Sequence, residues 1–222
     1  MFIQSLLKEI LSLIFPLNCL GCGREDTWLC PTCVARIPRS VHAVPHRPPL
    51  DGVWAITHYD NPIVNALLHY LKYNGVATVH MHLGALLVEL CSHIDNSSVH
   101  TILHTSSIIP VPLHPRRLRE RGYNQSLLLA QHVGDMRQIP VVPGALIRSK
   151  YTVPQASLDR AERLHNIDGA FSIGPDFKKL NKNVILVDDV ATTTATLAAC
   201  ATILKTHGTR AVWGFVIAHG NR

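Results

Sequence analysis

Short apolar runs and longer helical stretches alternate along most of the chain. Runs typical of strands cover residues 53–59, 108–111, 141–147, 184–187 and 211–217. Apolar positions recur at helical spacing after Asn61-Pro62, over 81–92 and 124–134, and in the stretch that ends at Gly208. Strands that alternate with helices are typical of an α/β domain with a mainly parallel twisted sheet flanked by helices. We therefore predict that class for residues 51–222.

The first nineteen residues form a separate apolar stretch with helical periodicity. Lys8 and Glu9 interrupt it, so it lacks the unbroken apolar run of a secretory signal peptide. We predict an amphipathic helix that docks on the rest of the protein, with association at a membrane surface as the alternative. We expect no transmembrane segment and a cytoplasmic location.

Residues 37–51 are rich in proline and mark a change of composition. The stretch contains Pro38, Pro45, Pro48 and Pro49, and it also holds His42 and His46. Such a composition predicts a solvated linker. We therefore expect an N-terminal part over 1–50, with the amphipathic helix, a cysteine module and the linker, followed by the α/β domain over 51–222.

Four of the six cysteines form two Cys-x-x-Cys pairs that are separated by seven residues. Each pair places two thiolates on one side of a tight turn, and two such pairs suit a tetrahedral Zn²⁺. Four thiolates leave no open position on the metal, which predicts a structural zinc. Two disulfides or a redox dithiol are the alternatives, and a reducing cytoplasm disfavours disulfides. The predicted ligands are Cys19, Cys22, Cys30 and Cys33, whereas Cys91 and Cys200 are expected to be buried apolar side chains.

Composition and charge narrow the class of partner only a little. The hydrophobic share of 47% and the charged share of 16% exclude a disordered or collagen-like chain as the main architecture. Lysine and arginine number 21 and the acids 15, which gives a formal net charge of +6. This excess permits anionic partners such as phosphates or nucleic acid.

The segment 184–196 carries the clearest chemical signal. An apolar run leads into Asp188 and Asp189, and four threonines follow at the expected start of a helix. Free N–H groups and the helix dipole at such a start favour a phosphate, and two carboxylates can hold vicinal hydroxyls or a metal. Together they fit a ribose 5-phosphate. The alternative is a strand that ends in ordinary capping aspartates, with threonine as a turn residue.

This segment resembles the motif that binds phosphoribosyl diphosphate (PRPP) in type I phosphoribosyltransferases. The rest of the chain is similar to the ComF family, which includes ComFC and GntX-like proteins. The similar stretches are the cysteine pairs, Leu71-Lys-Tyr-Asn-Gly75, 109–125, Pro154-Gln155, Leu158, Arg163, Asn166 and 169–171. The resemblance implies a type I phosphoribosyltransferase-like fold with a small N-terminal zinc module of four cysteines.

The resemblance also implies binding roles for three segments. Asp188 and Asp189 would bind the ribose hydroxyls, and the 5-phosphate would be wrapped by Ala191, Thr192, Thr193, Thr194, Ala195 and Thr196. The pyrophosphate loop would comprise Pro112, Leu113, His114, Arg116, Arg117, Arg119 and Arg121, whose arginines can meet a diphosphate bidentately. Residues 150–171 would form a flexible loop that contains Gln155 and Arg163. Mg²⁺ would bridge the diphosphate.

Thr194 departs from the family pattern, which has glycine at this point of the phosphate loop. Glycine permits a positive φ and a close approach of the ligand, and β-branched threonine resists both. We therefore expect a lower phosphate affinity or a different loop shape.

The resemblance implies a PRPP-binding competence protein that assists uptake and handling of single-stranded DNA in natural transformation, in contact with proteins of the competence machinery. One alternative is an active phosphoribosyltransferase with an unknown acceptor. Others are a non-catalytic zinc-bearing adaptor that binds DNA or protein, and a GntX-like metabolic protein. No residue is assigned a catalytic role.

Overall fold

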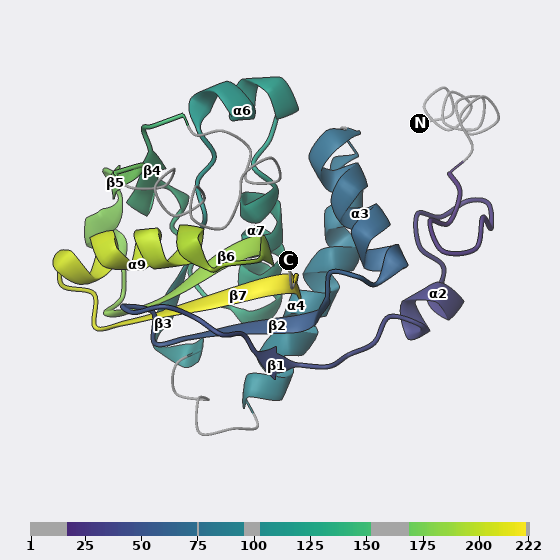
Figure 1. The fold of residues 1–222 in the computed structure, drawn as a ribbon, viewed down its shortest axis with the longest axis horizontal. Coiled ribbons are helices and arrows are strands. Elements are labelled where there is room, and N and C mark those ends of the chain that lie inside the picture. The colour runs from purple at the N-terminus through teal and green to yellow at the C-terminus, as the bar shows by residue number, and fades with distance from the viewer. Residues whose placement is uncertain (1–16, 75, 96–102, 152–168, 221–222) are drawn as a thin grey trace.

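The computed structural model describes residues 17–74, 76–95, 103–151 and 169–220. Its main sheet has five strands in the order β1-β2-β7-β6-β3 (Figure 1). β1 runs antiparallel to β2, and the other neighbouring strands are parallel. The strands are β1 (His42–Ala43), β2 (Gly52–His58), β3 (Ser106–Pro110), β6 (Asn183–Ala191) and β7 (Ala211–His219). The predicted α/β class with a mainly parallel sheet is confirmed.

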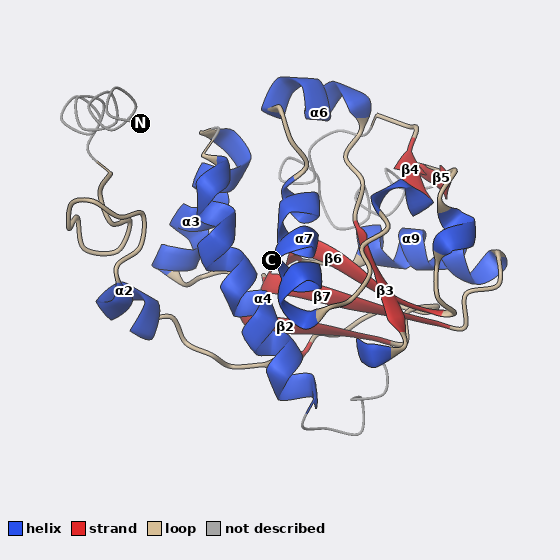
Figure 2. Cartoon of the chain, turned by 180° about the vertical axis from the view of Figure 1, so that it is seen from behind, coloured by secondary structure: helices blue, strands red, loops and turns tan. Residues whose placement is uncertain are grey.

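Helices cover both faces of this sheet (Figure 2). One face carries α3 (Pro62–Tyr73), α4 (His80–Asp95) and α7 (Gln125–Arg137), and the other carries α9 (Ala195–Thr206). A second, two-stranded antiparallel sheet of β4 (Leu146–Arg148) and β5 (Phe171–Ile173) packs beside α9. The shorter elements are α2 (Pro31–Ala35), α6 (Pro115–Arg121) and 3₁₀ turns at Ala77–Val79, Pro143–Ala145 and Phe177–Lys179.

Successive side chains of β6 explain why both faces of the sheet are covered. Ile185 and Val187 belong to the core beneath α4 and α7, whereas Val184 and Leu186 belong to the core beneath α9. All four side chains are fully buried. Burial of an apolar side chain of this size contributes roughly 1.5–3 kcal/mol. The unbroken apolar run therefore places β6 inside the sheet, and its polar end at the sheet's carboxyl edge.

The beginning of α3 follows from a local capping signal. The side chain of Asn61 accepts hydrogen bonds from the backbone N–H groups of Ile63 and Val64, both at 3.1 Å. Pro62 occupies the first turn, where its missing N–H costs nothing. The predicted apolar face of the helix is buried, so α3 is fixed at its start and along its length.

The prediction of a strand over 141–147 is wrong. Val141 makes one bridge to Ile108, and the chain then turns through the 3₁₀ turn Pro143–Ala145. Proline lacks an N–H for the ladder, and a side chain at Gly144 would collide with Asp176 at 2.2 Å. Only the last two predicted residues join β4, which pairs with β5 outside the main sheet.

The prediction that residues 37–51 form a solvated linker is also wrong. His42 and Ala43 form β1 at the edge of the sheet, and Val44 and Leu50 are buried in the core beneath α9. An edge strand tolerates nearby prolines because one side of it needs no hydrogen-bond donors. The domain boundary at residue 50 stays a prediction.

Two further predictions fall on residues 1–16 and 152–168, which lie outside the described residues. They are the N-terminal amphipathic helix and the flexible loop with Gln155 and Arg163. Within the part of the chain that the structure describes, no helix is both long and apolar enough to cross a membrane. Cys91 and Cys200 are fully buried, as predicted.

Candidate functional site

A pocket of about 200 Å³ opens at the carboxyl ends of β3 and β6. Ligands of parallel α/β sheets bind at this edge. Two carboxylates and four cationic side chains contribute to its wall, together with neutral groups. The lining residues are Lys72, Tyr73, Val111, Pro112, Leu113, Arg117, Arg121, Gln125, Ser126, Arg148, Asp188, Asp189, Val190 and Thr196.

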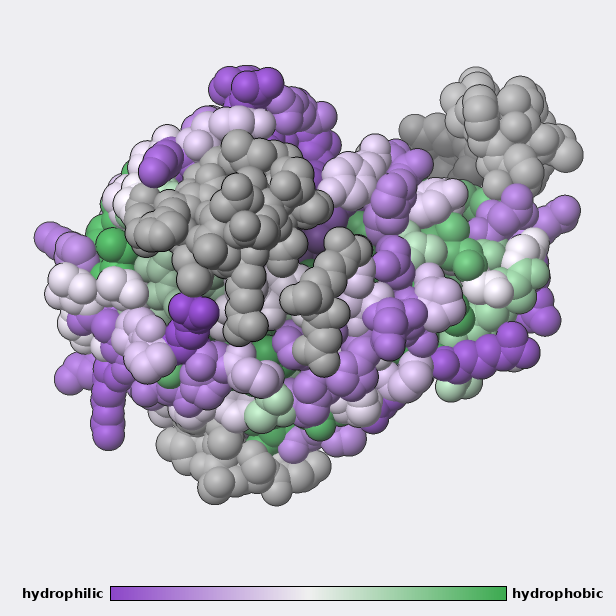
Figure 3. Space-filling model, in the orientation of Figure 1, coloured by the Kyte–Doolittle hydropathy of each residue, from purple (hydrophilic) through white to green (hydrophobic). Residues whose placement is uncertain are grey.

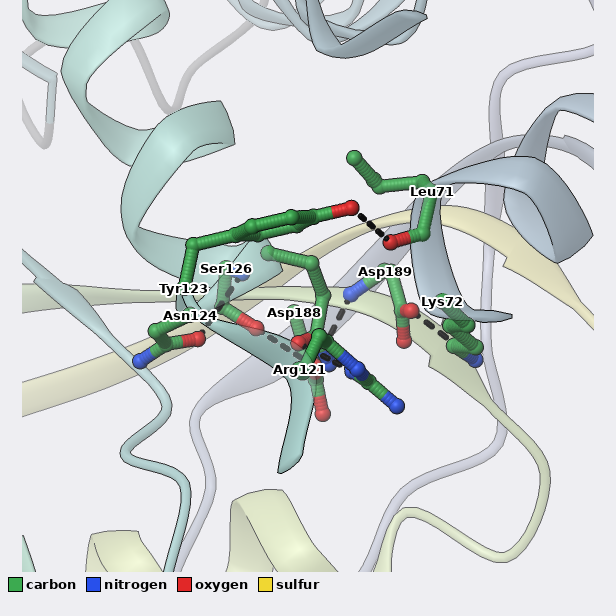
Figure 4. A network of polar contacts seen from close by, with 9 residues as sticks. Leu71, Lys72, Arg121, Tyr123, Asn124, Ser126, Asp188 and Asp189 are labelled. Carbon is green, nitrogen blue, oxygen red and sulfur yellow. Dashed lines mark hydrogen bonds and ion pairs between the residues drawn. The ribbon is translucent and has the colours of Figure 1, made fainter. Parts of the chain in front are cut away.

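The two carboxylates differ in their environments (Figure 4). Oδ1 of Asp188 accepts hydrogen bonds from the Ser126 hydroxyl and from the backbone N–H of Asp189, both at 2.9 Å. Burial, and then the neighbouring charge of Asp189, raise the pKa of Asp188 to about 7. The Asp188 carboxyl therefore takes up a proton more readily than an exposed aspartate does.

Asp189 is held by a cation from α3. Nζ of Lys72 lies 2.8 Å from Oδ2 of Asp189, whose side chain is only 5% exposed. Lys72 occupies the last turn of α3, where the helix dipole favours a cation. Burial opposes the charge of Lys72, but the carboxylates of Asp189 and Asp188 outweigh it and raise the pKa of Lys72. The pocket thus contains an internal ion pair.

α6 carries the four arginines of the predicted pyrophosphate loop. Nδ1 of His114 accepts a hydrogen bond from the Arg116 N–H at its start, and Gly122, with a φ of 83°, ends it. Arg117 and Arg121 line the pocket. The other two arginines are exposed, and strongly hydrophilic side chains gather over α6 at the top of the molecule (Figure 3).

Tyr123 and Asn124, which follow α6, make side-chain hydrogen bonds to three elements around the pocket. The Tyr123 hydroxyl donates to the Leu71 carbonyl at the end of α3, at 2.6 Å. The Asn124 amide donates to the Val111 carbonyl after β3, at 3.1 Å, and its oxygen accepts from the Ser126 N–H to cap α7. These side-chain contacts fix the ends of α3, β3 and α7 relative to one another.

A fourth cation reaches the pocket from β4. Arg148 is only 8% exposed, and its guanidinium carbon lies 5.3 Å from the ring centre of Phe171. Burial, and then the charge of Arg117, lower the pKa of Arg148. Two like charges that are held close together favour an anion between them.

Thr194 has a positive φ, although we expected a β-branched threonine to resist this conformation. Its φ is 55°, in the left-handed region, and it directly precedes α9. Its hydroxyl donates to the Thr193 carbonyl at 2.7 Å. A left-handed backbone costs a non-glycine residue about 1–3 kcal/mol. The loop therefore keeps the shape that glycine would allow, at the cost of strain.

The pocket gathers part of the residue set that the sequence predicted. Its lining includes Pro112, Leu113, Arg117, Arg121, Asp188, Asp189 and Thr196. The predicted residues that are described but do not line it are His114, Arg116, Arg119, Ala191, Thr192, Thr193, Thr194 and Ala195.

Seven lining residues were not among the predicted site residues. They are Lys72, Tyr73, Val111, Gln125, Ser126, Arg148 and Val190. Lys72 and Tyr73 lie in the stretch 71–75, whose likeness to the ComF family was a usable signal to which no role was given. Arg148 carried no local signal, because its place in the pocket depends on how β4 packs.

The four predicted metal ligands come together as a cluster. The sulfur atoms of Cys19, Cys22, Cys30 and Cys33 all lie within 4.8 Å of one another, and the Cys22 and Cys30 sulfurs are 3.7 Å apart. Tetrahedral zinc with Zn–S bonds of about 2.3 Å separates its sulfurs by roughly 3.8 Å. A side chain at Gly21 would come within 2.7 Å of the Cys33 sulfur, so the turn has room only for glycine. This cluster could hold a metal.

The backbone near the cluster favours the thiolates of Cys19 and Cys30, whereas burial raises the pKa of Cys33 to about 12. Burial opposes ionisation of Cys19, but backbone N–H groups, that of Cys30 first, outweigh it and lower the pKa of Cys19 to about 6. The Cys30 N–H lies 3.3 Å from the Cys19 sulfur. Thiolates are the form that binds a metal.

The cysteine module packs on α3. Cys19, Leu29, Cys30 and Cys33 share one apolar core with the buried face of α3. The Trp28 and Tyr70 rings lie 5.5 Å apart between centroids. The module and the pocket therefore contact different parts of the same helix.

Comparison with known proteins identifies relatives over nearly the whole chain, although no family model matches it. The chain is 31% identical over 214 residues to Competence protein F of Haemophilus influenzae. This alignment covers 95% of this chain and 88% of that protein. It is 28% identical over 200 residues to the DNA utilization protein YhgH of Escherichia coli K12, covering 87% of this chain and 85% of that protein. The solved structure of the allosteric regulatory enzyme of purine biosynthesis aligns with 68% of this chain and 30% of that chain, at 17% identity and a TM-score of 0.38.

Proposed function

Because this chain belongs to the competence protein F (ComF) family, we propose that it binds PRPP in the pocket at the carboxyl ends of β3 and β6 and acts in the uptake and handling of single-stranded DNA. The observation that carries the PRPP part is the convergence of two carboxylates and four cations at the carboxyl edge of the sheet. A ligand with a diol and several phosphate charges matches this combination of groups.

Each part of PRPP has a candidate partner. The carboxylates of Asp188 and Asp189 would accept hydrogen bonds from the ribose hydroxyls. Arg117 and Arg121 would contact the diphosphate, and residues 192–196 at the start of α9 would contact the 5-phosphate. Mg²⁺, when bound with the ligand, would neutralise part of the diphosphate charge.

The surface of α6 supports the DNA part of the proposal. The Arg116 and Arg117 guanidinium carbons lie 4.8 and 5.9 Å from the ring centre of Tyr151, and that of Arg121 lies 5.8 Å from Tyr73. Tyr73 is 68% exposed. Arginines that alternate with accessible aromatic rings suit single strands, because phosphates pair with the cations and bases stack on the rings.

We also propose that the cysteine cluster holds a structural zinc. Its four sulfur ligands would complete a tetrahedral shell and leave no position for a substrate. The zinc would therefore stabilise the module without taking part in chemistry at the pocket.

Calorimetric titration of the zinc-loaded protein with PRPP and Mg²⁺ tests the binding site. We expect saturable binding that weakens by at least about tenfold in Asp188→Asn/Asp189→Asn, because amides are weaker acceptors for the diol than carboxylates. Asp135→Asn, which removes an exposed carboxylate from α7, is the matched control and should bind as wild type does.

Absence of binding by a folded, zinc-loaded wild-type protein would contradict the proposal. It would favour a zinc-bearing adaptor that uses the α6 surface without PRPP. Release of diphosphate after addition of single-stranded DNA or a nucleobase would instead assign a transferase activity to the same site.

A further inference from the structure

The acid pair of the pocket, Asp188 and Asp189, is accompanied by the cationic side chain of Lys72. Nζ of Lys72 contacts Oδ2 of Asp189 at 2.8 Å, and the Lys72 side chain is 22% exposed. In Figure 4 the two side chains approach each other from α3 and from β6. The contact therefore joins residues that are far apart in the sequence.

Neighbouring carboxylates in a secluded pocket repel each other, and proteins relieve this in three ways. One carboxylate can take a proton, a metal ion can bind between the two, or a basic side chain can supply the charge. Here Asp188 accepts two hydrogen bonds and Asp189 has the basic side chain. The remaining charged groups of the wall, Arg117, Arg121 and Arg148, come from α6 and β4, and the Cys200 thiol faces Asp188 from α9.

Both partners of the ion pair are fixed by their backbones. The residue before Lys72, Leu71, is fully buried and accepts the hydrogen bond from Tyr123. Asp189 lies in β6, whose neighbours Asp188 and Val190 are in register with β7. The backbones on both sides of the ion pair are therefore held by contacts within the protein.

We propose that Lys72 is a built-in counter-cation of the acid pair, which keeps divalent metal ions off Asp188 and Asp189 and leaves their free oxygens to the ribose hydroxyls. Lys72 is thus a positioning and specificity-determining residue. This inference rests on the proposed function, since it concerns how the same pocket selects its ligand. Any Mg²⁺ would then enter with the diphosphate and not through the carboxylates.

The first test uses Mn²⁺ alone as the probe, measured by electron paramagnetic resonance on the zinc-loaded protein. Lys72→Met keeps the length of the side chain and removes its charge. We expect it to bind Mn²⁺ at least about tenfold more tightly than wild type, because two neighbouring carboxylates are then left without a counter-charge. Lys72→Arg should behave as wild type, and Lys72→Met/Asp189→Asn should lose the gained affinity.

Equal Mn²⁺ affinity of wild type and Lys72→Met would overturn the inference. So would a wild-type Mn²⁺ site that disappears in Asp188→Asn/Asp189→Asn. Thermal unfolding monitors the fold of each variant, and Lys72→Gln replaces Lys72→Met if the latter does not fold.

The second measurement separates this inference from the proposed function. PRPP binding is measured with and without Mg²⁺ for wild type and for Lys72→Met. We expect the affinity of the variant to depend more strongly on Mg²⁺ than that of wild type, because the metal must now supply the missing charge. An unchanged dependence would count against Lys72. If wild type binds no PRPP, the proposed function fails, and the Mn²⁺ experiment alone decides the role of Lys72.

Discussion

Thr194 shows how a single residue can store strain at the edge of a site. Its φ of 55° is one that glycine adopts freely, and the related PRPP motif has glycine at this point. We expect Thr194→Gly to raise the free energy of unfolding by about 1 kcal/mol, since relief of about 1–3 kcal/mol outweighs the greater backbone entropy of glycine and the lost methyl contacts. Chemical denaturation measures this change.

Thr192, two residues before Thr194, provides the control for this substitution. Its φ is not positive, so Thr192→Gly relieves no strain and should lower the free energy of unfolding by roughly 0.5–1 kcal/mol. A destabilised Thr194→Gly would show that the hydroxyl contact with the Thr193 carbonyl outweighs the backbone strain.

At the scale of the element, α6 divides its arginines between two surfaces. Arg117 and Arg121 line the pocket, whereas Arg116 and Arg119 are exposed. We expect Arg116→Gln/Arg119→Gln to weaken single-stranded DNA binding and to reduce its salt slope by about 1.4, at about 0.7 for each phosphate contact. PRPP binding should stay at the wild-type level. Fluorescence anisotropy of a labelled oligonucleotide over a series of salt concentrations measures the slope.

A variant with the same loss of charge at another surface is the control for α6. Lys178 and Lys179 are exposed in the 3₁₀ turn Phe177–Lys179, so Lys178→Gln/Lys179→Gln also removes two positive charges. An equal loss of DNA affinity in both variants would show that net charge alone governs binding and that α6 is not the contact surface.

At the scale of the whole molecule, the sequence predicted what depends on local pattern. The apolar run before Asp188, the cap at Asn61 and the paired cysteines each carry a physical signal within a few residues. The prediction of a strand over 141–147 was wrong because it gave the apolar pattern more weight than the break that Pro143 causes. Arg148 could not be assigned, because its place in the pocket is set by the packing of β4 against distant segments, whereas Lys72 lies in the stretch 71–75, which resembles the ComF family and was given no role.

The cysteine module and the pocket meet on α3, although they are distinct parts of the molecule. The module packs on the same apolar core as the helix, with Trp28 against Tyr70. Two residues after Tyr70, Lys72 contacts Asp189 in the pocket. Loss of order in the module should therefore loosen the support of the helix that positions Lys72.

Metal removal tests this connection across the molecule. A metal that binds the folded module and not the unfolded one stabilises it, so chelation of the zinc should lower the thermal midpoint and speed hydrogen exchange in α3. PRPP affinity should fall with it, because Lys72 loses its fixed position beside Asp189. Cys22→Ser should reproduce these effects without a chelator, since Cys22 is an exposed member of the cluster and contributes little to the core. Rapid exchange confined to the module, with α3 and PRPP affinity unchanged, would show that the rest of the apolar core is enough to hold the helix in place.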